Sequence, residues 1–333
     1  MLKKNWFLIG IFLTLMLGNF FPRIASTINP GNLTRDVVIV IMFLVTGLTL
    51  PTDAIIAGVK QVRLHVFIEA FIFIITPLYF IVTVQLFSRL IPDAAIPGIY
   101  ALALLPTTVT SCVVFTQVSG GNTVVAMFNA ALSNTLGIIL TPLLLSLLLA
   151  GSELSLPVSS LLGVFRSLTL LMLLPIVTGQ IFRRRIITTV QRYKKYFGIF
   201  GNISILLILF FVFSEVAENP EFAANLRIMF PVFVYLGASH LFLILLATGG
   251  AILLGEPKIN WVTIMYVAPQ KTLTMGAPML AIYFADQPAM LAIAIVPLLF
   301  YHPYQLLVAG ILRGIPQLNG PGLSEQGNGE KSA

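Results

Sequence analysis

Runs of about twenty apolar residues follow one another along almost the whole chain, with only short polar segments between them. A run of that length can cross the hydrocarbon core of a membrane as one helix. The composition agrees, because 58% of the residues are hydrophobic and 9% are charged, whereas soluble domains carry about 25% charged residues. We therefore predict an all-α polytopic membrane protein. Its ten spans are expected near residues 6–22, 37–58, 64–88, 95–118, 122–149, 159–182, 197–218, 229–254, 260–284 and 289–312.

The basic residues gather at alternate ends of these spans. If the N-terminus is cytoplasmic, thirteen of them fall on the cytoplasmic side, namely Lys3, Lys4, Lys60, Arg63, Arg183, Arg184, Arg185, Arg192, Lys194, Lys195, Lys258, Arg313 and Lys331. Four fall on the other side, namely Arg23, Arg35, Arg89 and Arg227. This is the positive-inside pattern of membrane proteins, and it predicts that both termini are cytoplasmic. The excess of 19 basic over 12 acidic residues then requires no nucleic-acid partner.

The short loops leave no room for a soluble domain, so we expect one transmembrane domain over residues 1–313. Residues 314–333 are rich in Gly and polar residues, and are expected to form a disordered cytoplasmic tail. The first apolar run is too long for a signal-peptide core and no A-x-A-like site follows it, so it is interpreted as the first span.

Two polar stretches, each beside a proline, interrupt the apolar runs. P-T-T-V-T-S begins at Pro106 and P-Q-K-T-L-T begins at Pro269, and a similar apolar run follows each, at 141–151 and 296–310. Proline removes a backbone donor and disfavours helix at the residue before it. We therefore predict two inverted five-helix repeats, at 5–151 and 159–312, in which the discontinuous fourth and ninth spans cross.

Inverted repeats with helices broken at matching positions are typical of secondary transporters whose binding site lies near the membrane midplane. Free carbonyls at a break suit a cation, and free N–H groups at a helix start favour an anion. The alternative is that the hydroxyl groups bond back to their own helices. The candidate binding residues are Thr108, Thr110, Ser111, Asn129, Ser133, Gln270, Lys271, Thr272 and Thr274.

Two of these candidates come from the fifth span. Asn129 and Ser133 are four residues apart and share a helix face, whereas Asn134 is expected to point elsewhere. Helix–helix hydrogen bonding explains the pair equally well. We expect Asn129 to lie deepest.

Lys271 is the most informative single residue. A lysine near the bilayer centre costs at least ~2.5 kcal/mol, so we expect it to face a cavity. It could be a fixed cation in place of a bound ion, a proton carrier or a ligand for a substrate carboxylate; the alternative is a lysine that reaches to the membrane surface. Glu69 is either an interfacial acid or a deeper counter-ion.

No enzyme signature is present in the sequence: there is no H-E-x-x-H, no P-loop and no G-x-S-x-G. We expect no enzyme and no cofactor, apart from a possible bound sodium ion at Ser111 and Gln270.

The two broken segments also resemble a known family. PTTVTSC at 106–112, SGGN at 119–122, FNAALSNTLGIILTP at 128–142 and APQKTLTMGAP at 268–278 are similar to the bile acid/sodium symporter family. The closest likeness is to its bacterial SBF-like branch, which is related to the seventh member of the animal bile-acid carriers, and GLTLP at 47–51 is similar to the second helix of that branch. The resemblance covers residues 5–312 and implies ten helices in two inverted halves, a panel and a core domain, and a location in the bacterial inner membrane.

The ion-binding residues of the better-known symporters are only partly present. The resemblance implies a Ser-Asn pair at the fourth helix, where this chain has Ser111 and Cys112. It also implies a Glu followed by Gln-Asn in the ninth helix, where this chain has Tyr266, Gln270 and Lys271. The anionic sodium ligand is therefore absent, and a cation stands near its place.

Taken together, we expect a symporter-like transporter of a small or amphipathic organic anion, coupled to sodium or protons and working by alternating access in a lipid membrane. Two alternatives stay open, namely a passive channel or facilitator and a non-transporting regulator of ion homeostasis. Saturable, gradient-stimulated transport would exclude the first, and loss of function in Ser111, Gln270 and Lys271 variants at normal protein level would exclude the second.

Overall fold

Helices are the only regular secondary structure in the part of the chain that the structure describes. The structure is a computed structural model that describes residues 2–49, 61–149, 158–216 and 229–320. In chain order its longer helices are α1 Leu2–Phe20, α2 Pro22–Ile28, α3 Leu33–Thr49, α5 Val62–Ala70, α6 Thr76–Leu86, α7 Ile96–Leu104, α8 Thr110–Val118, α9 Thr123–Leu149, α10 Val158–Leu168, α11 Leu174–Val216, α13 Phe230–Leu253, α14 Lys258–Val267, α15 Leu273–Tyr283 and α16 Pro288–Arg313.

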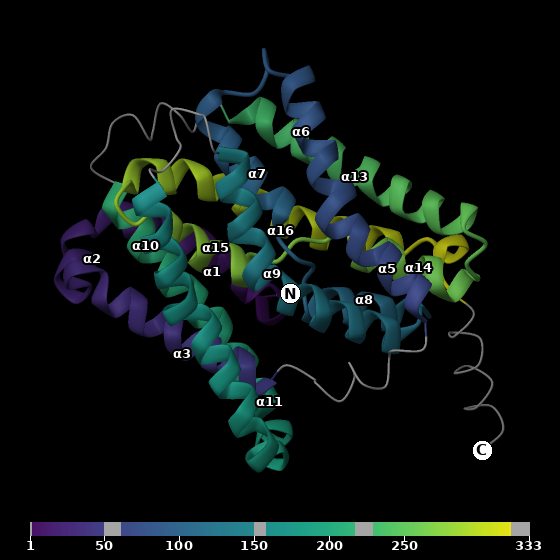
Figure 1. The fold of residues 1–333 in the computed structure, drawn as a ribbon, viewed down its shortest axis with the longest axis horizontal. Helices are drawn as coiled ribbons and strands as arrows, with labels where there is room; N and C mark the ends of the chain where they lie inside the picture. The colour runs from purple at the N-terminus through teal and green to yellow at the C-terminus, as the bar shows by residue number, and fades with distance from the viewer. Residues whose placement is uncertain (1, 50–60, 150–157, 217–228, 321–333) are drawn as a thin grey trace.

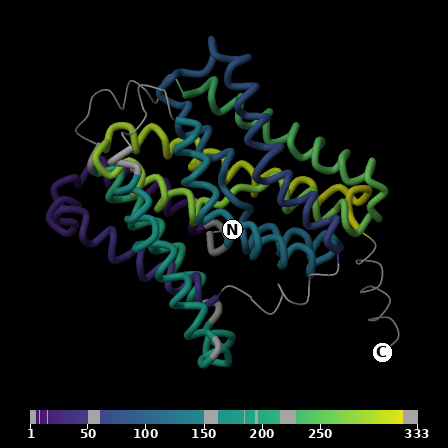
Figure 2. Tube along the Cα trace, in the orientation of Figure 1, coloured from purple at the N-terminus to yellow at the C-terminus, as the bar shows by residue number. Residues whose placement is uncertain are grey.

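The helices form two groups (Figures 1 and 2). In one group α11 packs on α1, α2 and α3, and α10 continues into α11 through a π-helical segment, η4 Thr169–Leu173. In the other, α7 packs on α6, α9 and α16, and α14 packs on α8, α9 and α13. Helix α11 also touches α15 and α16, so the two groups meet along it.

Many large apolar side chains on the outer helices are exposed. Phe12 is 70% exposed, Leu245 70% and Leu253 89%. Exposed apolar surface of this extent fits a lipid environment rather than water. Among the described residues, seven helices are long and apolar enough to span a membrane, or eight if the bent pair Ile9–Phe20 and Pro22–Ile28 is one span.

The structure has helix within each of the ten stretches expected to span, but two of these stretches are broken into halves that are each too short to cross a membrane alone. Two others are joined within α11, where Ile186 leaves helical geometry and produces a kink. The second expected span, 37–58, ends at Thr49 in the structure, because 50–60 lie outside the described residues. The count of ten spans in two inverted repeats therefore stays a prediction.

A π-helical segment, η2 Phe71–Ile75, joins α5 to α6. Here the N–H of Thr76 donates to the carbonyl of Phe71, five residues back, instead of to Ile72. The next residue, Pro77, has no N–H to donate. The carbonyl of Ile72 is thus left without its usual partner inside the helix.

Small residues allow the closest approach between helices in both groups. A Cβ atom added at Gly98 of α7 would collide with the backbone carbonyl of Ala294 in α16. Gly47 of α3 and Gly179 of α11 meet the opposite backbone in the same way, at Ile176 and Leu44.

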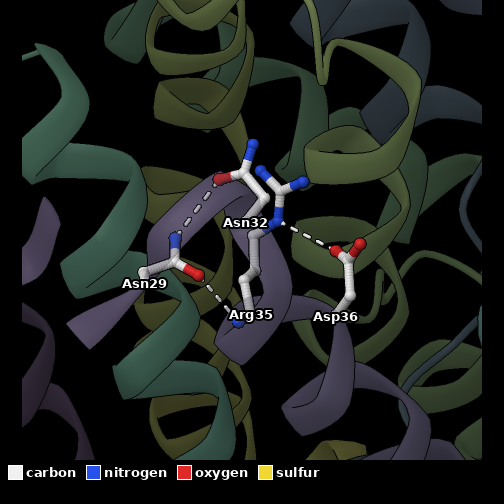
Figure 3. A network of polar contacts seen from close by, with 4 residues as sticks. All are labelled: Asn29, Asn32, Arg35 and Asp36. Carbon is white, nitrogen blue, oxygen red and sulfur yellow. Dashed lines mark hydrogen bonds and ion pairs between the residues drawn. The ribbon is translucent and has the colours of Figure 1, made fainter. Parts of the chain in front are cut away.

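The turn between α2 and α3 is closed by a polar network (Figure 3). The side chain of Asn29 accepts a hydrogen bond from the backbone N–H of Arg35 at 3.0 Å and donates to Asn32 at 3.2 Å. Arg35 is only 3% exposed, and its Nε lies 3.3 Å from the carboxylate of Asp36. Gly31 and Asn32 adopt positive φ, which allows the sharp reversal.

Residues 314–320 differ from the expectation of a disordered tail. Pro316–Leu318 form a short 3₁₀ helix, and the backbone N–H of Gly320 donates to the carbonyl of Ser119 at 2.7 Å. The start of the predicted tail is therefore packed on the loop after α8, and 321–333 lie outside the described residues.

Candidate functional site

The two proline-containing segments break their helices as the sequence predicts. Helix α7 ends at Leu104 and α8 begins at Thr110, while α14 ends at Val267 and α15 begins at Leu273. Leu105 and Thr272 are extended, with ψ of 145° and 124°. The backbone N–H of Thr272 donates to the carbonyl of Pro106 at 3.0 Å, so the two breaks are in direct contact.

A buried hydroxyl–amide cluster links the breaks through side chains. The hydroxyl of Thr108 donates to Oε1 of Gln270 at 2.6 Å, and the hydroxyl of Ser111 donates to the same oxygen at 3.0 Å. The backbone N–H of Cys112 donates to the Thr108 hydroxyl at 3.1 Å, so one of the N–H groups in the first turn of α8 that lack a helical partner is satisfied. Three of the predicted site residues are thus brought together across the crossing.

Lys271 lies inside the crossing and is 1% exposed. Its ammonium group donates to three backbone carbonyls, those of Ile72 at 3.2 Å, Ala103 at 2.9 Å and Leu105 at 2.8 Å. Each of these carbonyls has lost its helical partner, at η2 or at the end of α7, where the helix dipole also favours a positive charge. All three N–H donors of the protonated amine are satisfied, so Lys271 does not extend to the surface.

Amide side chains from the two long helices hold the backbone of the breaks. Gln305 of α16 accepts from the N–H of Lys271 and donates to its carbonyl, both at 2.8 Å. Asn134 of α9 donates to the carbonyl of Thr107 at 2.8 Å. Each break is therefore fixed by an amide from the long helix that comes after the broken pair, α9 after α7 and α8, and α16 after α14 and α15.

The remaining predicted residues of the breaks lie at different depths. Thr272 is buried, and it joins the breaks through its backbone rather than its hydroxyl. Thr110 is exposed, and Ser111 and Thr274 are half-buried. Thr110, Ser111 and Thr274 lie in the first turns of α8 and α15, where free N–H groups favour an anion.

Asn134 points away from the face of Asn129 and Ser133, as the sequence predicts, and it holds the first break. Asn129 bonds to His65 at 2.9 Å and to the carbonyl of Val125, and its role in binding stays a prediction. Ser133 donates to the carbonyl of Ala130 within its own helix at 3.4 Å. A helix turns about 100° per residue, so Asn129 and Asn134 face different neighbours.

Glu69 lies on α5, three residues before Ile72. Both of its carboxyl oxygens are buried and neither has a hydrogen-bond partner among the described residues. It interacts electrostatically with Lys271. The burial of both oxygens favours the deeper of the two positions that the sequence left open for Glu69.

Gln270 and Ser111, the expected sodium ligands, are already bonded to each other. Oε1 of Gln270 accepts from two hydroxyl groups, so a sodium ion there would have to displace at least one of them. The described residues hold no group of three or more His, Cys, Asp or Glu that could bind a metal ion.

An all-helical polytopic membrane protein with two discontinuous helices in contact at their breaks is what the fold and site define. The chain belongs to the SBF-like CPA transporter family, whose model matches residues 5–315. The resemblance seen in the sequence is thereby confirmed, and the protein is a transporter rather than an enzyme.

Three relatives illustrate the family. The chain is 32% identical to the sodium/bile acid cotransporter 7 of Xenopus tropicalis over 98% of this chain and 94% of the relative. It is 32% identical to the mouse protein of the same name, over 93% of this chain and 92% of the relative. It is also similar to an uncharacterised protein of Pseudomonas aeruginosa, at 31% identity over 92% of this chain and 91% of the relative.

Proposed function

We propose that the protein is a secondary active transporter that moves a small or amphipathic organic anion across the membrane by alternating access. The observation that carries the proposal is the contact between the two breaks, where Thr272 bonds to Pro106. Such a crossing places helix ends of both polarities at one point, which is the arrangement that transporters use to bind charged substrates. The names of the vertebrate relatives, sodium/bile acid cotransporter 7, are consistent with an organic anion.

The proposed architecture is ten spans in two inverted five-helix repeats, in a bacterial inner membrane with both termini cytoplasmic. The group of α1, α2, α3, α10 and α11 corresponds to the panel of the symporters, and the other group to the core. The two groups meet along α11. Sliding at that boundary would expose the crossing to one side of the membrane and then to the other.

The proposed anion site is at the first turns of α8 and α15. Thr110, Ser111 and Thr274 are the predicted polar residues there that are not fully buried. The N-terminal ends of the two helices favour negative charge. Lys271 adds a fixed positive charge behind them, while its own donors stay bonded to backbone carbonyls.

Coupling to a cation gradient completes the proposal, with sodium or protons as the driving ion. The ammonium group of Lys271 is bonded to carbonyl oxygens that have no helical partner. Such oxygens could bind a metal ion if the lysine were absent. We infer that this ammonium group takes the place of one bound ion.

Uptake into proteoliposomes tests the function. Labelled taurocholate, as an amphipathic anion, and succinate, as a small one, would be offered under a sodium gradient, a pH gradient or no gradient. Saturable accumulation above the outside concentration under one gradient supports the proposal. Equilibration without accumulation would favour a passive facilitator, and no transport of any organic anion in a wider panel would favour a regulator.

A further inference from the structure

Three buried oxygen atoms on the facing helices α5 and α9 have no hydrogen-bond donor among the described residues. They are both carboxyl oxygens of Glu69 and Oδ1 of Asn129. Buried polar atoms in proteins are nearly always paired, so unpaired ones indicate a group or a protonation state that the atoms still lack. All three atoms are acceptors in their present form.

Glu69 lies between two contacts that α5 makes with its neighbours. His65, Glu69 and Ile72 are spaced by four and three residues and therefore share one face of the helix. At one end of this face, Nδ1 of His65 lies 2.9 Å from Nδ2 of Asn129. At the other end, the carbonyl of Ile72 accepts from the ammonium of Lys271 at 3.2 Å. The carboxyl group is thus next to the crossing but outside the hydroxyl–amide cluster.

Lys271 is the basic side chain that interacts with Glu69, and it makes no hydrogen bond to it. The two side chains interact electrostatically. The three N–H groups of the ammonium, however, donate to the carbonyls of Ile72, Ala103 and Leu105, which together form the carbonyl cage of Lys271. His65, one turn away on the same helix face, is the nearest other titratable group on α5, and α9 contributes the uncharged Asn129. An ionised Glu69 would have a balancing charge but no donor.

We propose that Glu69 binds and releases the coupling proton of the transport cycle, an assignment that rests on the proposed function. A hydronium ion gives its proton to the carboxylate and leaves as water, so charge and atoms balance. One proton converts an acceptor of this region into an O–H donor and removes a buried negative charge at the same time.

Infrared difference spectroscopy on the purified full-length protein tests this directly. Wild type is expected to show the C=O absorption of a buried protonated carboxyl that is lost as the pH rises. Glu69→Gln should lack this absorption, and Asp93→Asn, which changes an exposed carboxylate, should keep it. Absence of the absorption in wild type from acidic to alkaline pH, or its survival in Glu69→Gln, would overturn the assignment.

A transport measurement separates this assignment from the proposed function. With taurocholate and succinate as probes, accumulation driven by a pH gradient in Glu69→Gln should fall to the level seen without a gradient, while exchange of labelled for unlabelled anion persists. Undiminished pH-driven accumulation in this variant would overturn the proton site and leave the transporter standing. Absence of all anion transport in wild type, with the carboxyl absorption present, would overturn the transporter and with it the coupling role, and would leave Glu69 only as a buried carboxyl group that binds a proton.

Discussion

The ammonium group of Lys271 lies 2.8 Å from the carbonyl oxygen of Leu105, the residue at which α7 leaves helical geometry. A side chain from the second broken helix thus closes the open end of the first. Proline breaks both helices, and the lysine satisfies carbonyls that the first break exposes. The breaks are therefore stabilised by direct hydrogen bonds to each other.

Replacing Lys271 by Met should destabilise the protein strongly. Three buried carbonyls would lose their donor, at about 1–3 kcal/mol each, so we expect a loss of several kcal/mol in thermal unfolding of the detergent-solubilised protein. Lys258→Met is the matched control, because Lys258 is exposed and surface changes are usually within about 0.5 kcal/mol. Equal unfolding temperatures for the two variants would contradict the claim that the bonds from Lys271 to the three carbonyls stabilise the fold.

The charges of Glu69 and Lys271 should be coupled. Removing one leaves the other buried and unbalanced, so Glu69→Gln combined with Lys271→Met should be less destabilised than the sum of the single variants, by about 0.5–3 kcal/mol. Unfolding of the two single variants and the double variant measures this energy. The same cycle with Asp93→Asn in place of Glu69→Gln should be additive, and additivity for Glu69 as well would argue against the pairing.

Thr108→Val should loosen the crossing while preserving its shape. The change removes a donor to Gln270 and an acceptor for the backbone of Cys112, and each buried group left without its partner costs about 1–3 kcal/mol. We expect lower unfolding temperature together with at least several-fold slower anion uptake. Thr169→Val, at an exposed hydroxyl that bonds only within its own helix, serves as the control. Uptake that is unchanged in both variants would remove the cluster from the mechanism.

Gly98→Ala should be far more harmful than Gly249→Ala. A Cβ at Gly98 would collide with the backbone of Ala294 in α16, whereas nothing lies within 4 Å of one at Gly249. Overpacking costs typically about 1–3 kcal/mol, while alanine in a free helical position gains up to about 1 kcal/mol. The yield and unfolding temperature of the two variants measure this difference in stability. A Gly98→Ala protein as stable as wild type would show that α7 and α16 can move apart to admit a methyl group.

Proline beside a cluster of polar residues made the breaks predictable from the sequence, whereas proline alone does not, because Pro142 and Pro297 lie inside continuous helices. Pro106 and Pro269 both lie where their helices are interrupted. The charge of Lys271 within an apolar segment predicts that its ammonium group has bonding partners inside the protein. The identity of those partners was beyond sequence reasoning, because the carbonyl of Ile72 is freed by a π-helical turn. Pro77, which removes the alternative donor, was the available signal.

Helix register was the weaker part of the prediction. Asn134 was set aside because it lies on another face than Asn129 and Ser133, yet Asn134 is the residue that reaches the break. A choice between two faces of one helix depends on how neighbouring helices are rotated, and an apolar composition as uniform as that of α9 contains no periodic signal to fix the rotation. For the same reason the sequence did not indicate Gln305, because the mostly apolar helix α16 has no periodic pattern that shows which neighbours this residue faces.

The π-helical turn at η2 has a mechanical consequence. Because the carbonyl of Ile72 is bonded to Lys271, α5 is fastened to the crossing at a single point inside the protein. Any rocking of one helix group against the other would carry α5, the two breaks and Glu69 as a rigid body. The proposed proton site and the proposed anion site would then become accessible from the other side of the membrane in the same conformational change.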